Sequence, residues 1–142
     1  MDKKDNRLLG MAGEHRIVSE LLLRGYNPSI AVIDKGVDII LDNGKTIQVK
    51  TTAQVKHGAK GNSVAIDISS TTYTRSRLKG MANPTDLRAD YFIVWIVPRN
   101  EFYIIPRDAI AARNVTNCLS ITPDLNQGFA IYKDKWDLLE GK

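Results

Sequence analysis

A turn-forming triplet between two short β-prone segments limits the possible folds of this chain more than any other feature. Residues 37–41 and 45–51 are rich in Val, Ile and Thr, and Asp42-Asn43-Gly44 separates them. Triplets of this kind favour tight antiparallel connections. The sequence therefore predicts a β-hairpin over residues 37–51.

The length of the turn decides which side chains share a face of this hairpin. A two-residue turn would place Asp38 opposite Val49, whereas a three-residue loop, with Gly44 left-handed, would place Asp38 opposite Gln48. Both turns are chemically reasonable. We predict the three-residue loop because it gathers the apolar side chains of the hairpin on one face, namely Ile39, Ile47 and Val49.

A helix is expected over residues 9–24, where apolar side chains recur at helical spacing. Glu20 and Arg24 have the spacing of an i,i+4 ion pair, and Gly25 is typical of the residue that follows a helix end. The apolar stripe of this helix comprises Ile17, Val18, Leu21 and Leu22.

The later segments indicate a mixed α/β pattern. Residues 91–97 form a continuous aromatic and β-branched run, which predicts a strand buried on both faces. Other expected elements are strands at 63–68 and 101–105, short helices at 108–113 (capped by Asp108) and 136–139, and edge strands or irregular structure at 114–121 and 130–132. Residues 53–62 and 69–89 are expected to be basic loops. The order predicts one α/β domain, residues 1–142, around one sheet.

Composition excludes several classes of protein. The chain has 142 residues with 43% hydrophobic and 25% charged side chains, which is ordinary globular usage. It has no apolar run long enough to span a membrane, and its charged first residues do not resemble a signal peptide. Cys118 is the only cysteine, so no internal disulfide is possible and a cytoplasmic location is expected. A net charge of +4 permits a polyanionic partner without requiring one.

Four polar residues of the expected hairpin and helix form a set that suits phosphodiester hydrolysis. Asp38 interrupts an apolar strand, where a carboxylate is costly unless it is paired, exposed at an edge or bound to a metal. In the predicted register Asp38 lies opposite Gln48, with Lys50 one diagonal step away. Glu14 lies in line with the apolar stripe near the start of the expected helix. It would join the others if the helix packs on their face of the hairpin.

Oxygen atoms of carboxylates, amides and the backbone are the ligands that Mg²⁺ prefers in proteins. Asp38 can bind the cation directly, while the Gln48 side-chain oxygen and the Val49 carbonyl can complete its coordination. Glu14 can hold a metal-bound water or a second ion. Lys50 can position the attacking water or stabilise developing negative charge. The set therefore predicts a magnesium-dependent catalytic centre in which Mn²⁺ can substitute.

Simpler interpretations exist for each of these residues taken alone. An aspartate in one strand and a lysine in the next often form only a cross-strand salt bridge. A glutamate at the start of a helix is favoured by the helix dipole without any further role. Only the combination of Glu14, Asp38 and the Gln48/Lys50 spacing favours catalysis.

The two expected loops carry cationic side chains that can follow a phosphate backbone, although scattered basic residues are more often a solvated surface. These candidate nucleic-acid-binding residues are Lys56, His57, Lys60, Arg75, Arg77 and Lys79.

These motifs resemble the PD-(D/E)XK nuclease superfamily. The matching pieces are Gly13-Glu14 opening a helix, residues 36–40 with Asp38, and residues 47–51 with Gln48 and Lys50. Residues 90–94 and 102–106 resemble the later core of a branch that includes intron-encoded homing endonucleases and is similar to archaeal Holliday-junction resolvases. The resemblance implies a central mixed β-sheet flanked by helices, a restriction-endonuclease-like core, with magnesium at the acidic residues.

The chain departs from the family motif at two positions. Gly36-Val37 occupies the place of the proline, and Gln48 replaces the usual acidic residue, although glutamine also occurs in the homing-endonuclease branch. Losing that negative charge should weaken metal binding.

Three functions are compatible with these residues. The first is a metal-dependent endonuclease acting on DNA in homing, junction resolution or restriction. The second is a non-catalytic nucleic-acid-binding module on the same scaffold, and the third is an interaction domain whose polar set forms a buried network. We favour the endonuclease. We expect it to act as a homodimer or larger homo-oligomer, because so small a domain covers little duplex.

Overall fold

The computed structural model describes residues 3–32, 36–59, 61–68, 87–113, 115 and 118–140. The helical segments in these ranges are α1 (Lys3–Leu23), α3 (Arg107–Ala112) and the 3₁₀ turns η3 (Val97–Arg99), η4 (Gly128–Tyr132) and η5 (Trp136–Leu139). The strands are β1 (Ser29–Ile30), β2 (Ile39–Ile40), β3 (Thr46–Thr52), β4 (Lys56–Gly58), β5 (Gly61–Asp67), β6 (Tyr91–Ile96), β7 (Glu101–Pro106) and β8 (Cys118–Ile121).

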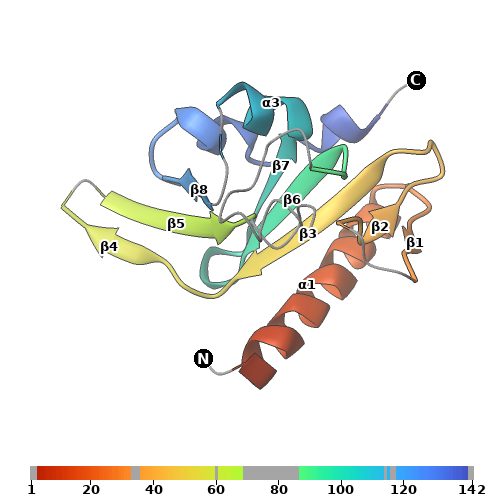
Figure 1. Ribbon diagram of the computed structural model, residues 1–142, viewed down its shortest axis with the longest axis horizontal. Helices are drawn as coiled ribbons and strands as arrows, with labels where there is room; N and C mark the ends of the chain where they lie inside the picture. Colours follow the sequence, from red (N-terminus) through yellow and green to blue (C-terminus); the bar gives the residue numbers. More distant parts are fainter. Residues whose placement is uncertain are drawn as a thin grey trace, which may run out of the picture.

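A five-stranded mixed sheet forms the centre of the fold. Its strand order is β1-β2-β3-β6-β7, with β3 and β6 parallel and the other neighbours antiparallel. Helix α1 runs alongside β3, and α3 lies on the other side of the sheet (Figure 1). The predicted α/β class with a central mixed sheet and flanking helices is therefore confirmed.

A second, three-stranded sheet of order β4-β5-β8 corrects the expectation of a single sheet. Its first hairpin lies in residues 53–62, which we had expected to be a loop. There His57 pairs with Asn62, and Gly61 has a left-handed φ of 106°. The polar composition that indicated a loop belongs to an exposed hairpin, because side chains that face solvent need not be apolar.

Two apolar clusters lie on opposite faces of the five-stranded sheet. One cluster packs α1 against the sheet through buried Ile17, Leu21, Ile47 and Val49. The other packs the opposite face against the second sheet, α3 and η4. Strand β6 contributes Ile93 to the first cluster and Phe92 to the second, so the predicted burial of this strand on both faces is confirmed.

Helix α1 is longer at its start than the apolar pattern predicted. It begins at Lys3 instead of residue 9, because its first turns are exposed and polar and leave no apolar periodicity to detect. The predicted Glu20–Arg24 ion pair forms at 3.2 Å. Gly25 adopts a φ of 90° just after the helix end, as expected. The stripe is narrower than predicted, since Leu22 is 57% exposed.

The hairpin between β2 and β3 has the predicted three-residue loop. Leu41 N–H donates to Lys45 O at 2.9 Å, and Gly44, with a φ of 87°, donates its N–H to Leu41 O at 2.9 Å. Ile39 consequently pairs with Ile47. This register confirms the shared apolar face, and Asp38 lies along the edge of β3, with hydrogen bonds to Ile47 and Val49.

The C-terminal part differs from the prediction in two details. Residues 130–132, expected as an edge strand or irregular structure, belong to the 3₁₀ turn η4. Pro106 is the N-cap residue of α3, so Asp108 lies in its first turn and does not cap it. The predicted edge strand within 114–121 is β8, and the short terminal helix is η5. In the described ranges, no helix has the length and apolar character needed to cross a bilayer.

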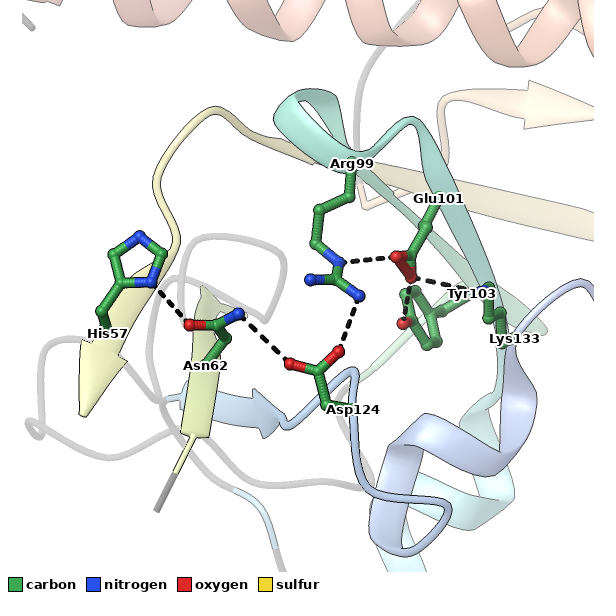
Figure 2. Close-up of polar contacts among 7 residues, drawn as sticks. All are labelled: His57, Asn62, Arg99, Glu101, Tyr103, Asp124 and Lys133. Atoms are coloured by element: carbon green, nitrogen blue, oxygen red, sulfur yellow. Dashed lines mark hydrogen bonds and ion pairs between the residues drawn. The ribbon is translucent and has the colours of Figure 1, made fainter. Parts of the chain in front are cut away.

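A polar network at the start of β7 connects the two sheets (Figure 2). Glu101 accepts hydrogen bonds from Arg99 and from the Tyr103 hydroxyl at 2.9 Å, and Lys133 Nζ lies 3.5 Å away. Burial opposes ionisation of Glu101. The hydrogen bonds from Arg99 and Tyr103 and the charge of Lys133 outweigh this effect, and the pKa of Glu101 is lowered from 4.5. Burial of the Tyr103 hydroxyl, together with its hydrogen bond to Glu101, raises the pKa of Tyr103 far above its usual 10.0.

The lowered pKa of Glu101 predicts a loss of stability in acid. Because the carboxylate is favoured in the folded state, its stabilisation is present above the unfolded value near 4.5 and is lost as pH falls below it. We therefore expect the unfolding free energy of the wild type to fall more steeply below about pH 4.5 than that of Glu101→Gln. Urea denaturation across this range, with the exposed Asp137→Asn as control, measures the difference. If the unfolding free energies of wild type and Glu101→Gln fell equally with pH, the predicted contribution of the Glu101 carboxylate would be wrong.

Candidate active site

Asp38 lies immediately before β2 and is 5% exposed. Its carboxylate Oδ2 accepts the Val49 N–H at 2.8 Å, and its own N–H donates to Ile47 O at 2.8 Å. The side chain therefore takes a position on the edge of β3 that a backbone partner would otherwise fill. The N–H and C=O of one strand residue point to the same side, so the Val49 carbonyl also faces this edge.

Gln48 and Lys50 lie on one face of β3, opposite Phe92 and Val94 of β6. The Gln48 side chain is 6% exposed, and its Oε1 has no hydrogen-bond partner among the described residues. A buried oxygen without a partner costs about 1–3 kcal/mol, so it calls for a specific explanation. A cation bound at this oxygen would provide one.

Glu14 belongs to the helix that packs on the face of the hairpin opposite to Gln48 and Lys50. It lies in the middle of α1, not at the start, and it is half-buried. Helix α1 packs on the apolar face of the hairpin, where a Cβ built on Gly13 would lie 1.6 Å from Thr51 Oγ1. Gln48 and Lys50 project from the other face of β3. A cation shared by Glu14 and Gln48 would therefore lie at the edge of β3, where Asp38 is located.

The donors at this edge fit a hard divalent cation. They are all oxygens, from the Asp38 carboxylate, the Gln48 amide and the Val49 backbone carbonyl, which is the chemistry that Mg²⁺ prefers, and Glu14 of α1 would be a second carboxylate. Among the described residues, no group of three or more His, Cys, Asp or Glu side chains could hold a metal. Two carboxylates supply less negative charge than the usual family motif, which predicts weak binding of the cation.

Gln48→Glu tests this deficit of charge. The substitution keeps the length of the side chain and adds the acidic group of the family motif, so we expect the magnesium concentration for half-maximal binding to fall about tenfold. Calorimetric titration with Mg²⁺ in the absence of nucleic acid measures the effect. The control is Gln54→Glu, because Gln54 is an exposed glutamine just after β3. Equal affinities for wild type and Gln48→Glu would exclude Gln48 from the metal site.

The predicted nucleic-acid-binding residues are only partly described. Lys56 and His57 are exposed on β4. Lys60, Arg75, Arg77 and Lys79 lie outside the described residues. Their assignment stays a prediction.

Two features of the site were not predicted from the sequence. Gly13 is the point where α1 approaches β3, and a glycine inside a helix pattern was the available signal for such a contact. Asn62 hydrogen-bonds His57 and thereby sets the position of a predicted binding residue. Nothing in the sequence indicated this pair, because the hairpin that creates it was expected to be a loop.

Comparisons with known proteins identify the family of the chain. A family model for PD-(D/E)XK endonucleases matches residues 4–139, so the chain belongs to that family and the predicted resemblance is confirmed. The bacterial homing endonuclease I-Ssp6803I has a similar structure, with a TM-score of 0.67 and 18% identity over 94% of this chain and 89% of that chain. The Holliday junction resolvase Hjc of Archaeoglobus fulgidus gives a TM-score of 0.48 and 18% identity over 80% of this chain and 83% of that chain. No curated protein matches the sequence.

Proposed function

We propose that the chain is a magnesium-dependent endonuclease that hydrolyses phosphodiester bonds in DNA, with Glu14, Asp38, Gln48 and Lys50 as its reaction centre. The observation that carries this proposal is the buried Gln48 Oε1, which has no hydrogen-bond partner among the described residues and belongs to the residue before Val49, whose N–H donates to Asp38. Membership of the PD-(D/E)XK endonuclease family supports the same chemistry. Mn²⁺ should substitute for Mg²⁺, since both accept oxygen ligands.

Each residue has a definite task in this proposal. Asp38 and Gln48, with the Val49 carbonyl, hold the cation, which supplies activation of water and neutralisation of phosphate charge when it is bound. Glu14 accepts a hydrogen bond from a water on the helix side of the edge. Lys50, half-buried on β3, places its ammonium group against the phosphate and stabilises the negative charge that develops there.

The proposed substrate is DNA bound as a polyanion by the basic residues outside the reaction centre, Lys56 and His57 of β4 among them. Homing, junction-resolving and restriction-like cleavage all fit this chemistry. We further propose a cytoplasmic homodimer or higher homo-oligomer, in which two reaction centres cut the two strands of one duplex.

One observation favours a second candidate function, a DNA-binding module without catalysis. Gln48 replaces an acidic residue, and the described residues include no cluster of three acidic, His or Cys side chains for a metal. Such a module would bind DNA in a salt-dependent manner but would not turn it over.

A nicking assay separates the two functions. Supercoiled plasmid and a four-way DNA junction are incubated with the protein and Mg²⁺ or Mn²⁺, and wild type is compared with Lys50→Ala. We expect metal-dependent nicking by the wild type and at least about a 100-fold lower rate for Lys50→Ala. The preferred substrate distinguishes resolution from the other roles. DNA binding that persists without nicking would refute the endonuclease and support the binding module.

A further inference from the structure

A chain of hydrogen bonds leads from the core to the tip of the exposed β4–β5 hairpin (Figure 2). Arg99 Nη2 donates to Asp124 Oδ1 at 2.9 Å. Asn62 Nδ2 donates to the other carboxylate oxygen, Asp124 Oδ2, at 3.2 Å. His57 Nδ1 lies 2.6 Å from Asn62 Oδ1. These four residues come from η3, the segment after β8, β5 and β4.

The chemistry of these groups sets the direction of every hydrogen bond. An ionised carboxylate only accepts, and Arg99 only donates, so Asp124 requires the NH₂ group of the Asn62 amide on its side. The amide oxygen of Asn62 then faces His57 and can only accept. His57 Nδ1 must therefore carry a proton, which leaves Nε2 as the ring nitrogen that is available to a ligand.

We propose that Asn62 and Asp124 are positioning residues that hold the His57 imidazole with Nδ1 protonated, so that Nε2–H of its charged form donates to a backbone phosphate of bound DNA. The DNA contact rests on the proposed function, whereas the state of the ring does not. His57 is exposed on β4, so a phosphate can reach its ring. Arg99 also binds Glu101 of β7, and this ties the hairpin to the sheet that carries the reaction centre.

The state of the ring can be measured without DNA. Long-range ¹H–¹⁵N correlation spectra of the imidazoles, recorded above about pH 8 where an ordinary ring is neutral, distinguish a proton on Nδ1 from one on Nε2. We expect the Nδ1–H form for His57 and a change toward the Nε2–H form in Asn62→Ala. His15, the other histidine, is exposed on α1 and is the internal control. An Nε2–H form of His57 in the wild type would overturn the positioning role.

The phosphate contact is tested by DNA binding at about pH 6, where an ordinary imidazole is charged. Fluorescence anisotropy with a DNA duplex is measured in the Lys50→Ala background, so that the DNA stays intact. We expect His57→Ala and Asn62→Ala each to weaken binding about fivefold and the double variant to be no weaker than the single ones, because both remove one contact. His57→Ala should also reduce the salt dependence by roughly one phosphate contact. His15→Ala should have no effect.

Three outcomes would each contradict a different part of the proposal. Additive losses in the double variant would show that Asn62 does not act through His57. DNA binding that is unchanged in His57→Ala would overturn the contact while leaving the proposed nuclease intact. Failure of the Lys50→Ala parent and the wild type to bind any DNA would overturn both, and the imidazole spectra would still decide the state of the ring.

Discussion

Asp38→Asn is expected to reduce the rate of DNA cleavage by at least about 100-fold while leaving the stability of the fold nearly unchanged. Even the loss of an outer partner of a metal ligand typically costs about 10- to 100-fold, and a direct carboxylate ligand should cost more. The asparagine keeps a side-chain oxygen that can accept the Val49 N–H, which Asp38 Oδ2 accepts at 2.8 Å. Initial rates of plasmid nicking and urea denaturation measure the two effects separately.

Asp38→Ala is the informative comparison for this prediction. It removes the carboxylate and also leaves the Val49 N–H without its acceptor in a buried place, so it should lose about 1–3 kcal/mol of stability as well as activity. Cleavage by Asp38→Asn at the rate of the wild type would remove Asp38 from the reaction centre. Equal stability of the Ala and Asn variants would show that the hydrogen bond to Val49 contributes little.

Gly13→Ala is expected to lower the stability of the protein more than any other single methyl group added to α1. The new Cβ would lie 1.6 Å from Thr51 Oγ1 and 2.8 Å from Thr51 Cβ, so the helix and the strand must move apart. Overpacking of this kind costs about 1–3 kcal/mol. The shift would also move the adjacent Glu14, so nicking should slow together with the loss of stability. Thermal unfolding and nicking rates test the two consequences.

The same helix provides a matched control. A Cβ added at Gly10 meets no atom within 4 Å, so Gly10→Ala should stabilise the protein by about 0.5–1 kcal/mol through the higher helix propensity of alanine. Thr51→Gly removes the side-chain atoms that a Cβ at Gly13 would clash with. The double variant Gly13→Ala/Thr51→Gly should therefore recover part of the activity that Gly13→Ala loses. Equal stability of Gly10→Ala and Gly13→Ala would contradict the close contact of α1 with β3.

The sequence predicted best those features that depend on neighbouring residues. The loop at Gly44 and the pairing of Ile39 with Ile47 were predictable because turn chemistry and the apolar face favour the same register. Strand β6 was predictable because its apolar run leaves few alternatives. The same register brings Asp38 to the edge of β3, where its carboxylate accepts the Val49 N–H.

Features that depend on distant contacts were not predictable. The start of α1 at Lys3 left no apolar signal, and Leu22 fits the helical stripe but is exposed because nothing in the described part of the chain covers it. The face on which α1 packs depends on the contact of Gly13 with Thr51, whose residues lie far apart in the sequence. Periodicity therefore could not indicate on which side of the hairpin the helix with Glu14 packs.

The parallel pairing of β3 with β6 has a consequence for how new target preferences can arise. Two parallel neighbours need a connection that returns from one end of the sheet to the other, and here this connection spans residues 53–90. It contains the β4–β5 hairpin and all the basic residues proposed to bind DNA, whereas the four proposed reaction-centre residues come before it. Within this connection β5 pairs with β8 and contributes Val64 and Ile66 to the core, whereas β4 is exposed, so the end of the hairpin at β4 can change without disturbing the core. If the proposed DNA contacts of β4 are correct, exchanging this exposed end between relatives should change the preferred target while the bond-breaking chemistry stays with the recipient.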